Sequence, residues 1–131
     1  MKQFKLFLLT TLVSFNACNN SSDMLLGKWE LKEVIPPKNA SFMLVPMMTL
    51  EENAIYEFEP DQTCKTTFVV GSHRNFTGKY ELRADTLFLH KPKDVKGKNS
   101  SDVYKIVSIS YDSLVLHDLR TQSHKILVKQ L

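Results

Sequence analysis

Few side chains in this sequence have the type and spacing that catalysis requires. His73 lies next to Arg74 in a predicted loop, and His117 lies next to Asp118 near the end of a predicted strand. Neutral imidazole can serve as an acid–base group or a metal ligand, but isolated histidines in turns are more often solvated. The sequence has no Gly-x-Ser-x-Gly, His-Glu-x-x-His, Cys-x-x-Cys or glycine-rich phosphate loop. It therefore predicts no enzyme, no bound metal and no cofactor.

The other reactive groups have structural explanations. Asp61, Asp85 and Asp112 lie at predicted turns, where a carboxylate can accept hydrogen bonds from backbone amides. Cys64 is either a buried small apolar residue or a free thiol. Cys64 can form a disulfide with Cys18 only if Cys18 is not lipidated.

The first 17 residues are typical of a secretory leader. Two lysines within Met1–Lys5 precede a largely apolar run, Leu6–Phe15, that is shorter than the roughly 20 residues of a membrane-spanning helix. The stretch "FNAC", Phe15–Cys18, resembles the bacterial lipobox, although Phe15 stands where Leu is usual. This resemblance implies a signal peptide over residues 1–17 and a lipoprotein anchored to a membrane through Cys18. A secreted protein without lipid is the alternative. Residue 19 is Asn and not the Asp that retains lipoproteins of enteric bacteria in the inner membrane, which favours the outer membrane of the cell envelope.

One small domain remains after the leader. Removing 17 of 131 residues leaves 114, enough for one hydrophobic core. Residues 18–23 are predicted to form a polar tether and residues 24–131 the domain. Lys2 and Lys5 leave with the leader, so 17 basic side chains become 15 against 14 acidic ones. The cluster Lys91–Ser100 is broken by Pro, Asp and Gly, which predicts a solvated loop and no nucleic-acid partner.

The domain shows the two-residue polar and apolar alternation of β-strands. In the first strand Trp29, Leu31 and Ile35 share an apolar face, with Glu33 as the exception. Eight strands are predicted: Gly27–Ile35, Ala54–Glu59, Cys64–Val70, Phe76–Leu82, Thr86–His90, Val103–Ser110, Ser113–Leu119 and His124–Gln130. Their mostly short connections favour an all-β fold, an eight-stranded antiparallel up-and-down barrel without open edges. A two-sheet sandwich is the alternative.

Four segments resemble lipocalins. "LLGKWEL", which holds a Gly-x-Trp signature, is followed by "YEFEPDQT", "GKYELRADTLFL" and "YKIVSISYDSLVL", as in lipocalin-like domains of bacterial lipoproteins. The resemblance implies a calycin-like barrel in which Gly27 allows a tight entry into the first strand and Trp29 plugs the closed end. It also implies a late basic side chain across Trp29, here Arg120 by position. Gln62 and Ala84 stand where that pattern often has Gly, which predicts looser turns.

One connection is unusually apolar. "SFMLVPMMTL", Ser41–Leu50, has six apolar side chains within seven residues, which would form a large exposed patch unless they face a cavity or a partner. The segment either covers the open mouth of the barrel, with His73 and Arg74 on a polar rim, or packs on the barrel as part of its core. The predicted ligand-binding residues are Met43, Leu44, Met47 and Met48 of this segment and Tyr56, Phe58, Phe68 and Tyr80 of the strands.

Two functions follow from different classes of protein. The first is a lipid-anchored binding protein that holds a small apolar ligand inside the barrel. The second is an interaction or inhibitor module, filled by its own side chains, whose loops dock another envelope protein. Inward aromatic side chains can line a cavity or fill one, so the sequence leaves both open.

Overall fold

The computed structural model describes residues 21–40, 53–68, 75–94 and 96–131. Within these ranges one short helix, α1 (Ser21–Leu25), precedes eight strands. The strands are β1 (Gly27–Ile35), β2 (Ile55–Phe58), β3 (Thr63–Thr67), β4 (Phe76–Arg83), β5 (Thr86–Lys91), β6 (Ser100–Ile109), β7 (Ser113–Asp118) and β8 (His124–Gln130). They pair in sequence order, every pair is antiparallel, and β8 closes the barrel on β1. The predicted all-β, eight-stranded up-and-down barrel is confirmed, and the sandwich alternative is excluded.

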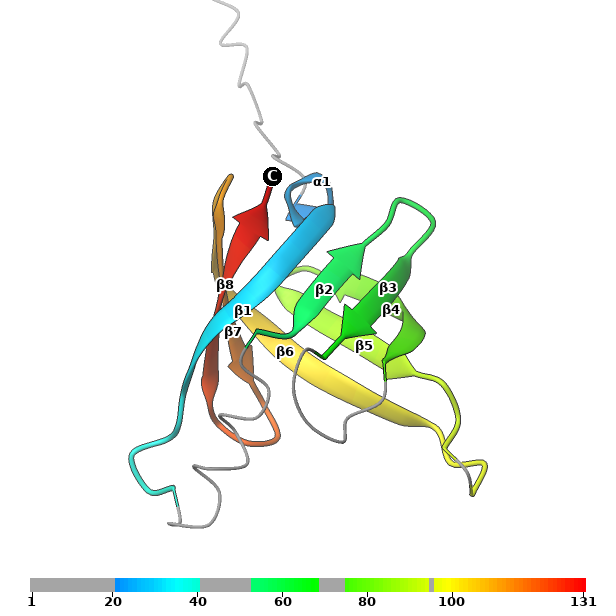
Figure 1. The fold of residues 1–131 in the computed structure, drawn as a ribbon. Coiled ribbons are helices and arrows are strands. Elements are labelled where there is room, and N and C mark those ends of the chain that lie inside the picture. Colours follow the sequence, from blue (N-terminus) through cyan, green and yellow to red (C-terminus); the bar gives the residue numbers. More distant parts are fainter. Residues whose placement is uncertain (1–20, 41–52, 69–74, 95) are drawn as a thin grey trace, which may run out of the picture.

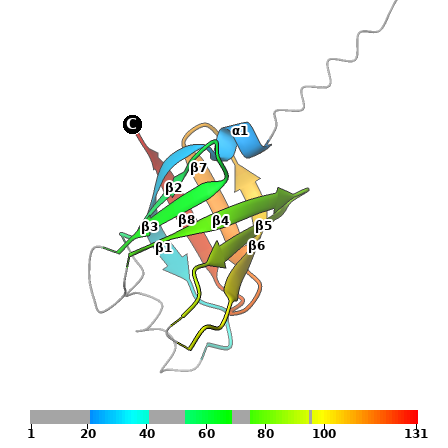
Figure 2. The ribbon, with the colours of Figure 1, turned by 90° about the vertical axis from the view of Figure 1, so that its right-hand side faces the viewer.

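The two ends of the barrel differ in their connections. At one end lie α1, the C-terminus and the hairpin turns that join β2 to β3, β4 to β5 and β6 to β7 (Figure 1). At the other end the longer connections join β1 to β2, β3 to β4 and β5 to β6. Figure 2 shows the strands wrapping around one axis between these ends. We call them the closed end and the open end. In the part of the chain that the structure describes, no helix has the length and hydropathy needed to cross a membrane.

Strand boundaries follow the predictions closely except in two places. β6 begins at Ser100, before the predicted Val103, because Ser100, Ser101 and Asp102 pair with β5. This lengthens the strand into the cluster predicted as a solvated loop. β3 ends at Thr67 rather than Val70, and residues 69–74 lie outside the described residues.

An irregularity in β1 reverses the predicted direction of its last side chain. The pairing register of β1 with β8 shifts between Leu31 and Glu33, as in a β-bulge. The extra residue moves the two-residue alternation by one, so Val34 is buried and Ile35 is 42% exposed. The prediction that Ile35 points inward is therefore wrong. The same shift explains Glu33, which lies on the solvent face and is no longer an exception.

Two turns at the closed end are tight without glycine. Gln62 has a φ of 67° and Ala84 a φ of 53°, both in the left-handed region. The amide of Gln62 donates to the carbonyl oxygen of Glu59 at 3.1 Å, which closes the β2–β3 turn. The prediction of looser turns is wrong. The backbone at Gln62 and Ala84 adopts the strained left-handed conformation that Gly adopts more easily.

Candidate functional site

The closed half of the interior is filled by large side chains from α1 and the adjacent strand ends. Trp29 and Leu25 are completely buried, and the indole Nε1 of Trp29 donates to the Leu25 carbonyl oxygen at 2.7 Å. Phe58 and Tyr80 pack edge to face with their ring centroids 5.1 Å apart. We define the closed half by Leu25, Trp29, Phe58, Tyr80, Leu114 and Leu127, all of them buried. Helix α1 includes Ser21 to Asp23, which lie within the stretch predicted as a tether.

The basic side chain that crosses Trp29 is Lys129. Its Nζ lies 5.1 Å from the centroid of the Trp29 ring and 3.4 Å from the Met24 carbonyl oxygen. Gly27, with a φ of 116°, makes room, because a Cβ there would lie 2.9 Å from the Lys129 side chain. Arg120 is exposed in the β7–β8 turn at the open end. The assignment to Arg120 is therefore wrong: β7 ends far from Trp29, whereas β8 returns to it and pairs Lys129 with Trp29.

The predicted interior ligand-binding residues divide into two groups. Phe58 and Tyr80 belong to the packed closed half, where the Tyr80 hydroxyl donates to the Glu59 carbonyl oxygen at 2.8 Å. Tyr56 is buried, and Phe68 is half-buried beside Phe76, with ring centroids 6.3 Å apart. Met43, Leu44, Met47 and Met48, and the predicted rim residues His73 and Arg74, lie outside the described residues.

Toward the open end the interior becomes polar. Lys125 of β8, Asp118 of β7 and Tyr104 of β6 are 5%, 4% and 3% exposed. The Nζ of Lys125 lies 5.2 Å from the centroid of the Tyr104 ring, across the intervening strand β7. Thr66 is buried on the β3 wall and pairs with Tyr56. We define the open half by Tyr56, Thr66, Tyr104, Asp118 and Lys125.

The pKa of Tyr104 reflects its buried environment. Burial raises the pKa of the Tyr104 phenol well above its usual value, and the charges of Asp102 and Asp118 act in the same direction. The nearby ammonium of Lys125 acts in the opposite direction but does not outweigh burial. Tyr104 is therefore a neutral phenol at physiological pH and can donate a hydrogen bond from its hydroxyl group.

The acidic side chains near Tyr104 are held by other donors. One carboxylate oxygen of Asp118 accepts hydrogen bonds from the amides of Arg120 and Thr121 at 2.9 and 3.2 Å. Asp102 pairs with Lys91 at 2.7 Å, and the Nζ of Lys91 also lies 5.6 Å from the centroid of the Phe76 ring. Asp118 thus shapes the β7–β8 turn, and the Lys91–Asp102 pair lies where β5 and β6 reach the open end.

The residues considered for chemistry do not converge on a catalytic arrangement. The rings of His117 and of His124 on the neighbouring strand are tilted against each other with centroids 4.6 Å apart, and the Nε2 of His117 is 3.2 Å from the Gln122 side-chain oxygen. Burial raises the pKa of the Cys64 thiol to about 12, so this free cysteine is an unreactive thiol in the core. Within the described ranges no group of three or more His, Cys, Asp or Glu residues could hold a metal ion.

The three predicted turn aspartates differ in their contacts. An Asp61 carboxylate oxygen accepts from the Thr63 amide at 3.0 Å, and the hydrogen bonds from Thr63 lower the pKa of Asp61. Asp112 accepts from the Ser110 hydroxyl at 3.2 Å, and Asp85 lies 3.7 Å from the Lys105 ammonium. The predicted hydrogen bond from a backbone amide is thus present at Asp61, whereas Asp112 and Asp85 contact side chains.

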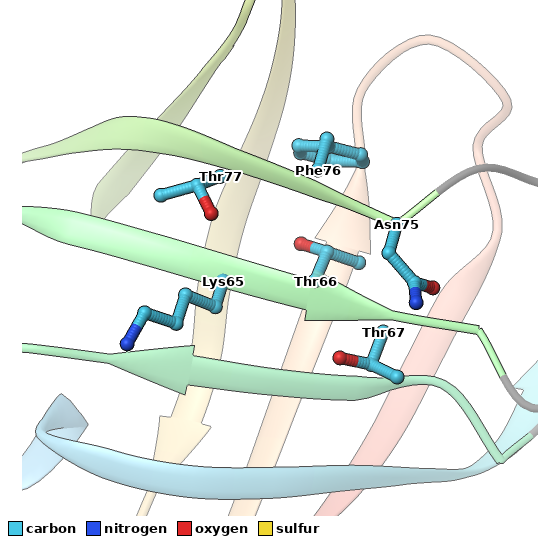
Figure 3. Close-up of a pocket in the computed structure, with 6 residues that line it drawn as sticks. All are labelled: Lys65, Thr66, Thr67, Asn75, Phe76 and Thr77. Carbon is cyan, nitrogen blue, oxygen red and sulfur yellow. The ribbon is translucent and has the colours of Figure 1, made fainter.

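A polar hollow of about 250 Å³ lies on β3 and β4 near the open end (Figure 3). It is lined by Lys65, Thr66, Thr67, Asn75, Phe76 and Thr77. Figure 3 shows Phe76 and Thr66 pointing away from Lys65 and Asn75, in keeping with the alternation of the two strands. The Asn75 side-chain oxygen accepts from the Phe68 amide at 2.9 Å, so it links the strands where their pairing ends. Its polar lining suits solvent better than an apolar ligand.

Comparisons with known proteins agree with the barrel fold. The sequence profile of a lipocalin-like domain family matches residues 25–116, from the end of α1 into β7. The chain belongs to this lipocalin-like family. No curated protein matches it.

Two solved structures share the lipocalin-like fold. One is a lipocalin-like protein from Bacteroides uniformis, with a TM-score of 0.60, 19% identity, and coverage of 82% of this chain and 99% of that one. The other is an uncharacterized protein from Bacteroides eggerthii, with a TM-score of 0.59, 14% identity, and coverage of 80% and 98%. At these identities the likeness establishes the fold alone.

Sequence reasoning missed the polar residues inside this lipocalin-like barrel. Lys125 alternates with Leu127 in β8, and Tyr104 alternates with Ile106 in β6, so each shares the inward face of an apolar neighbour. That alternation is the signal that places both side chains inside the barrel. Residue type points the other way at Lys125, because lysine is almost never fully buried and a lysine in a strand normally lies on the solvent face.

Proposed function

We propose that this protein is a lipid-anchored envelope protein that binds a small, mainly apolar molecule in the open half of its barrel. The observation that carries the proposal is the difference between the two halves. The closed half is packed with Trp29, Phe58 and other large side chains, whereas the open half has smaller Thr66 and Ala54 on walls that also carry aromatic rings. An eight-stranded barrel has an interior wide enough for side chains or for one small ligand.

Family membership supports a binding role in general terms. Lipocalin-like barrels commonly hold small hydrophobic ligands and are generally not enzymes. Function still has to be argued from the site. The aromatic side chains of Tyr56, Phe68 and Phe76, buried or half-buried toward the open end, provide apolar contact area for such a ligand.

The anchor is the second part of the proposal. Helix α1 begins at Ser21, three positions after Cys18, and packs at the closed end. A lipid on Cys18 would therefore hold the closed end next to the membrane and direct the open end away from it. Replacing Cys18 with Ala should release the protein from the detergent phase. If the leader of the variant is cleaved off and the protein still partitions into the detergent phase like the parent, the anchoring proposal fails.

Ligand binding is tested with 1-N-phenylnaphthylamine, an uncharged fluorescent probe. We expect saturable binding with one site per barrel, and displacement of the probe by a long-chain alcohol. Absence of saturable binding by the folded protein would contradict the proposal. Native mass spectrometry of protein purified from its own envelope then asks whether a small molecule is retained.

A protein partner is the second candidate, and one observation favours it. Several large apolar side chains on the outside of the barrel are exposed: Ile35, Val107, Tyr111, Leu119 and Val128. In an interaction module these residues would contact a partner while the interior remained filled. A co-purifying protein together with an absence of probe uptake would favour this function over ligand binding.

A further inference from the structure

A cleft of about 410 Å³ lies at the closed end, between α1, the β2–β3 turn and β4. Figures 1 and 2 both show α1 beside this turn. The lining of the cleft includes Asp23, Leu26, Gln62, Tyr80 and Leu82. The cleft is at the opposite end of the barrel from the open half, so it is a separate site from the one proposed above.

The cleft offers apolar surface that the fold itself leaves uncovered. Leu26 and Leu82 both line it, and each is only half-buried. Pro60, also in the lining, is exposed in the β2–β3 turn. Pockets of this size hold small organic molecules, whose apolar groups pack against such side chains. An organic group in the cleft would remove this apolar surface from water, which is favourable.

The charge of the cleft is negative. Among the described residues that line it, Asp23 alone is charged, and its side chain has no ion-pair or hydrogen-bond partner among those residues. A second carboxylate lies nearby, since burial raises the pKa of the Tyr80 phenol and the charge of Asp61 acts in the same direction. The hydrogen bonds from Thr63 lower the pKa of Asp61, so this group is ionised at neutral pH.

Two basic side chains of the adjoining strands are paired with other carboxylates. Lys65 of β3 pairs with Glu59 at 2.8 Å, and Arg83 of β4 pairs with Glu81 at 2.7 Å. Neither Lys65 nor Arg83 belongs to the lining of the cleft. The carboxylate in the cleft is therefore available to a cation from solution.

We propose that the cleft is a second binding site, which takes an alkylammonium ion with its ammonium group on Asp23 and its carbon chain against Leu26 and Leu82. An ammonium has three N–H donors, and the side-chain oxygen of Gln62 is a further acceptor in the same lining. Hydrogen bonds between an ammonium and a carboxylate are stronger than those between neutral groups. This ammonium group occurs in free amines and in the ethanolamine head group of phospholipids.

The test compares dansylcadaverine, which carries a primary ammonium group, with its uncharged N-acetyl derivative. The protein should bind dansylcadaverine saturably and at least tenfold more tightly than the derivative. Asp23→Asn should weaken binding of dansylcadaverine at least tenfold and change binding of the derivative less than threefold, whereas Asp23→Glu should stay within about threefold of the parent for both. Asp85→Asn removes an exposed carboxylate from the β4–β5 turn at the same end and should change neither affinity.

Competition on the unmodified protein locates the site and identifies the source of the ammonium. Octylamine should displace dansylcadaverine at a concentration at least tenfold lower than octanol does, and 1-N-phenylnaphthylamine should not displace it. Displacement by dihexanoylphosphatidylethanolamine as well would support a lipid head group as the natural ligand, whereas displacement by octylamine alone would support a free amine.

Three results would overturn the proposal. These are absence of saturable dansylcadaverine binding, equal displacement by octylamine and octanol, and unchanged dansylcadaverine binding in Asp23→Asn. Displacement of dansylcadaverine by 1-N-phenylnaphthylamine would place the amine in the barrel interior and would also contradict a separate site. If 1-N-phenylnaphthylamine does not bind at all, the function proposed above fails, while the Asp23→Asn and octylamine results still decide for or against the cleft.

Discussion

The closed half and the open half of this barrel are built from the same eight strands but bury different kinds of side chain. In the closed half, Trp29 is buried, its only polar atom is hydrogen-bonded to the Leu25 carbonyl oxygen, and Phe58 packs on Tyr80. In the open half, a lysine, an aspartate and a tyrosine are buried. Burying such groups opposes folding, so the free energy that stabilises the barrel must come mainly from the closed half. The comparison separates the residues that hold the fold from those that are available for binding.

The largest effect that tests this separation is loss of the plug. Trp29→Ala should lower the free energy of unfolding by about 3–5 kcal/mol, the usual range for deleting a buried large aromatic side chain. Such a loss is a large part of the stability of a small domain. Denaturant melts measure it, and Ile35→Ala on the solvent face provides a control with a much smaller loss. A loss below about 1 kcal/mol for Trp29→Ala would show that the closed half does not dominate stability.

The open half should show the reverse pattern. Replacing Met43, Met47 and Met48 together with Ser is expected to weaken uptake of the neutral naphthylamine probe at least tenfold, equivalent to about 1.4 kcal/mol, while the melting midpoint moves little. This prediction concerns the apolar connection between β1 and β2, which the sequence assigns to the mouth. If the triple change mainly unfolds the domain, that connection belongs to the core and the comparison has to be redrawn.

A smaller effect distinguishes the two basic residues assigned to the plug. Lys129→Met should destabilise the domain by about 0.5–1 kcal/mol, because Lys129 lies over the Trp29 ring. Arg120→Met should change stability by less than about 0.5 kcal/mol, since Arg120 is exposed in a turn at the other end. The two variants remove the same charge, so chemical melts compare position alone. A larger loss of stability for Arg120→Met than for Lys129→Met would contradict the contact between Lys129 and Trp29, and would favour Arg120, the residue that the sequence indicated.

Sequence reasoning succeeded where a local pattern carries the physics. Alternating side chains and short turns predicted the barrel, and the Gly-x-Trp signature predicted the buried plug. It failed where the pattern is interrupted, because alternation cannot reveal the extra residue between Leu31 and Glu33 that turns Ile35 outward. It also failed where a charged residue is buried, as at Lys125, since residue type alone assigns lysine to solvent. To choose between Arg120 and Lys129, one must know at which end of the barrel β7 and β8 finish, and the local sequence pattern does not show this.

The smallest expected effect lies in the turn that joins β4 to β5 at the closed end. Ala84 has a φ of 53°, a conformation in which its Cβ is crowded by the backbone and which costs a non-glycine residue about 1–2 kcal/mol. Ala84→Gly removes this strain but increases the freedom of the unfolded chain, by about 0.5–1 kcal/mol. We therefore expect a net stabilisation of about 0.5 kcal/mol in urea melts. Ala40→Gly is the matched control, because Ala40 is not among the residues with positive φ and the same change there should destabilise the domain. Destabilisation by both variants would show that the closed-end turn is unstrained in solution.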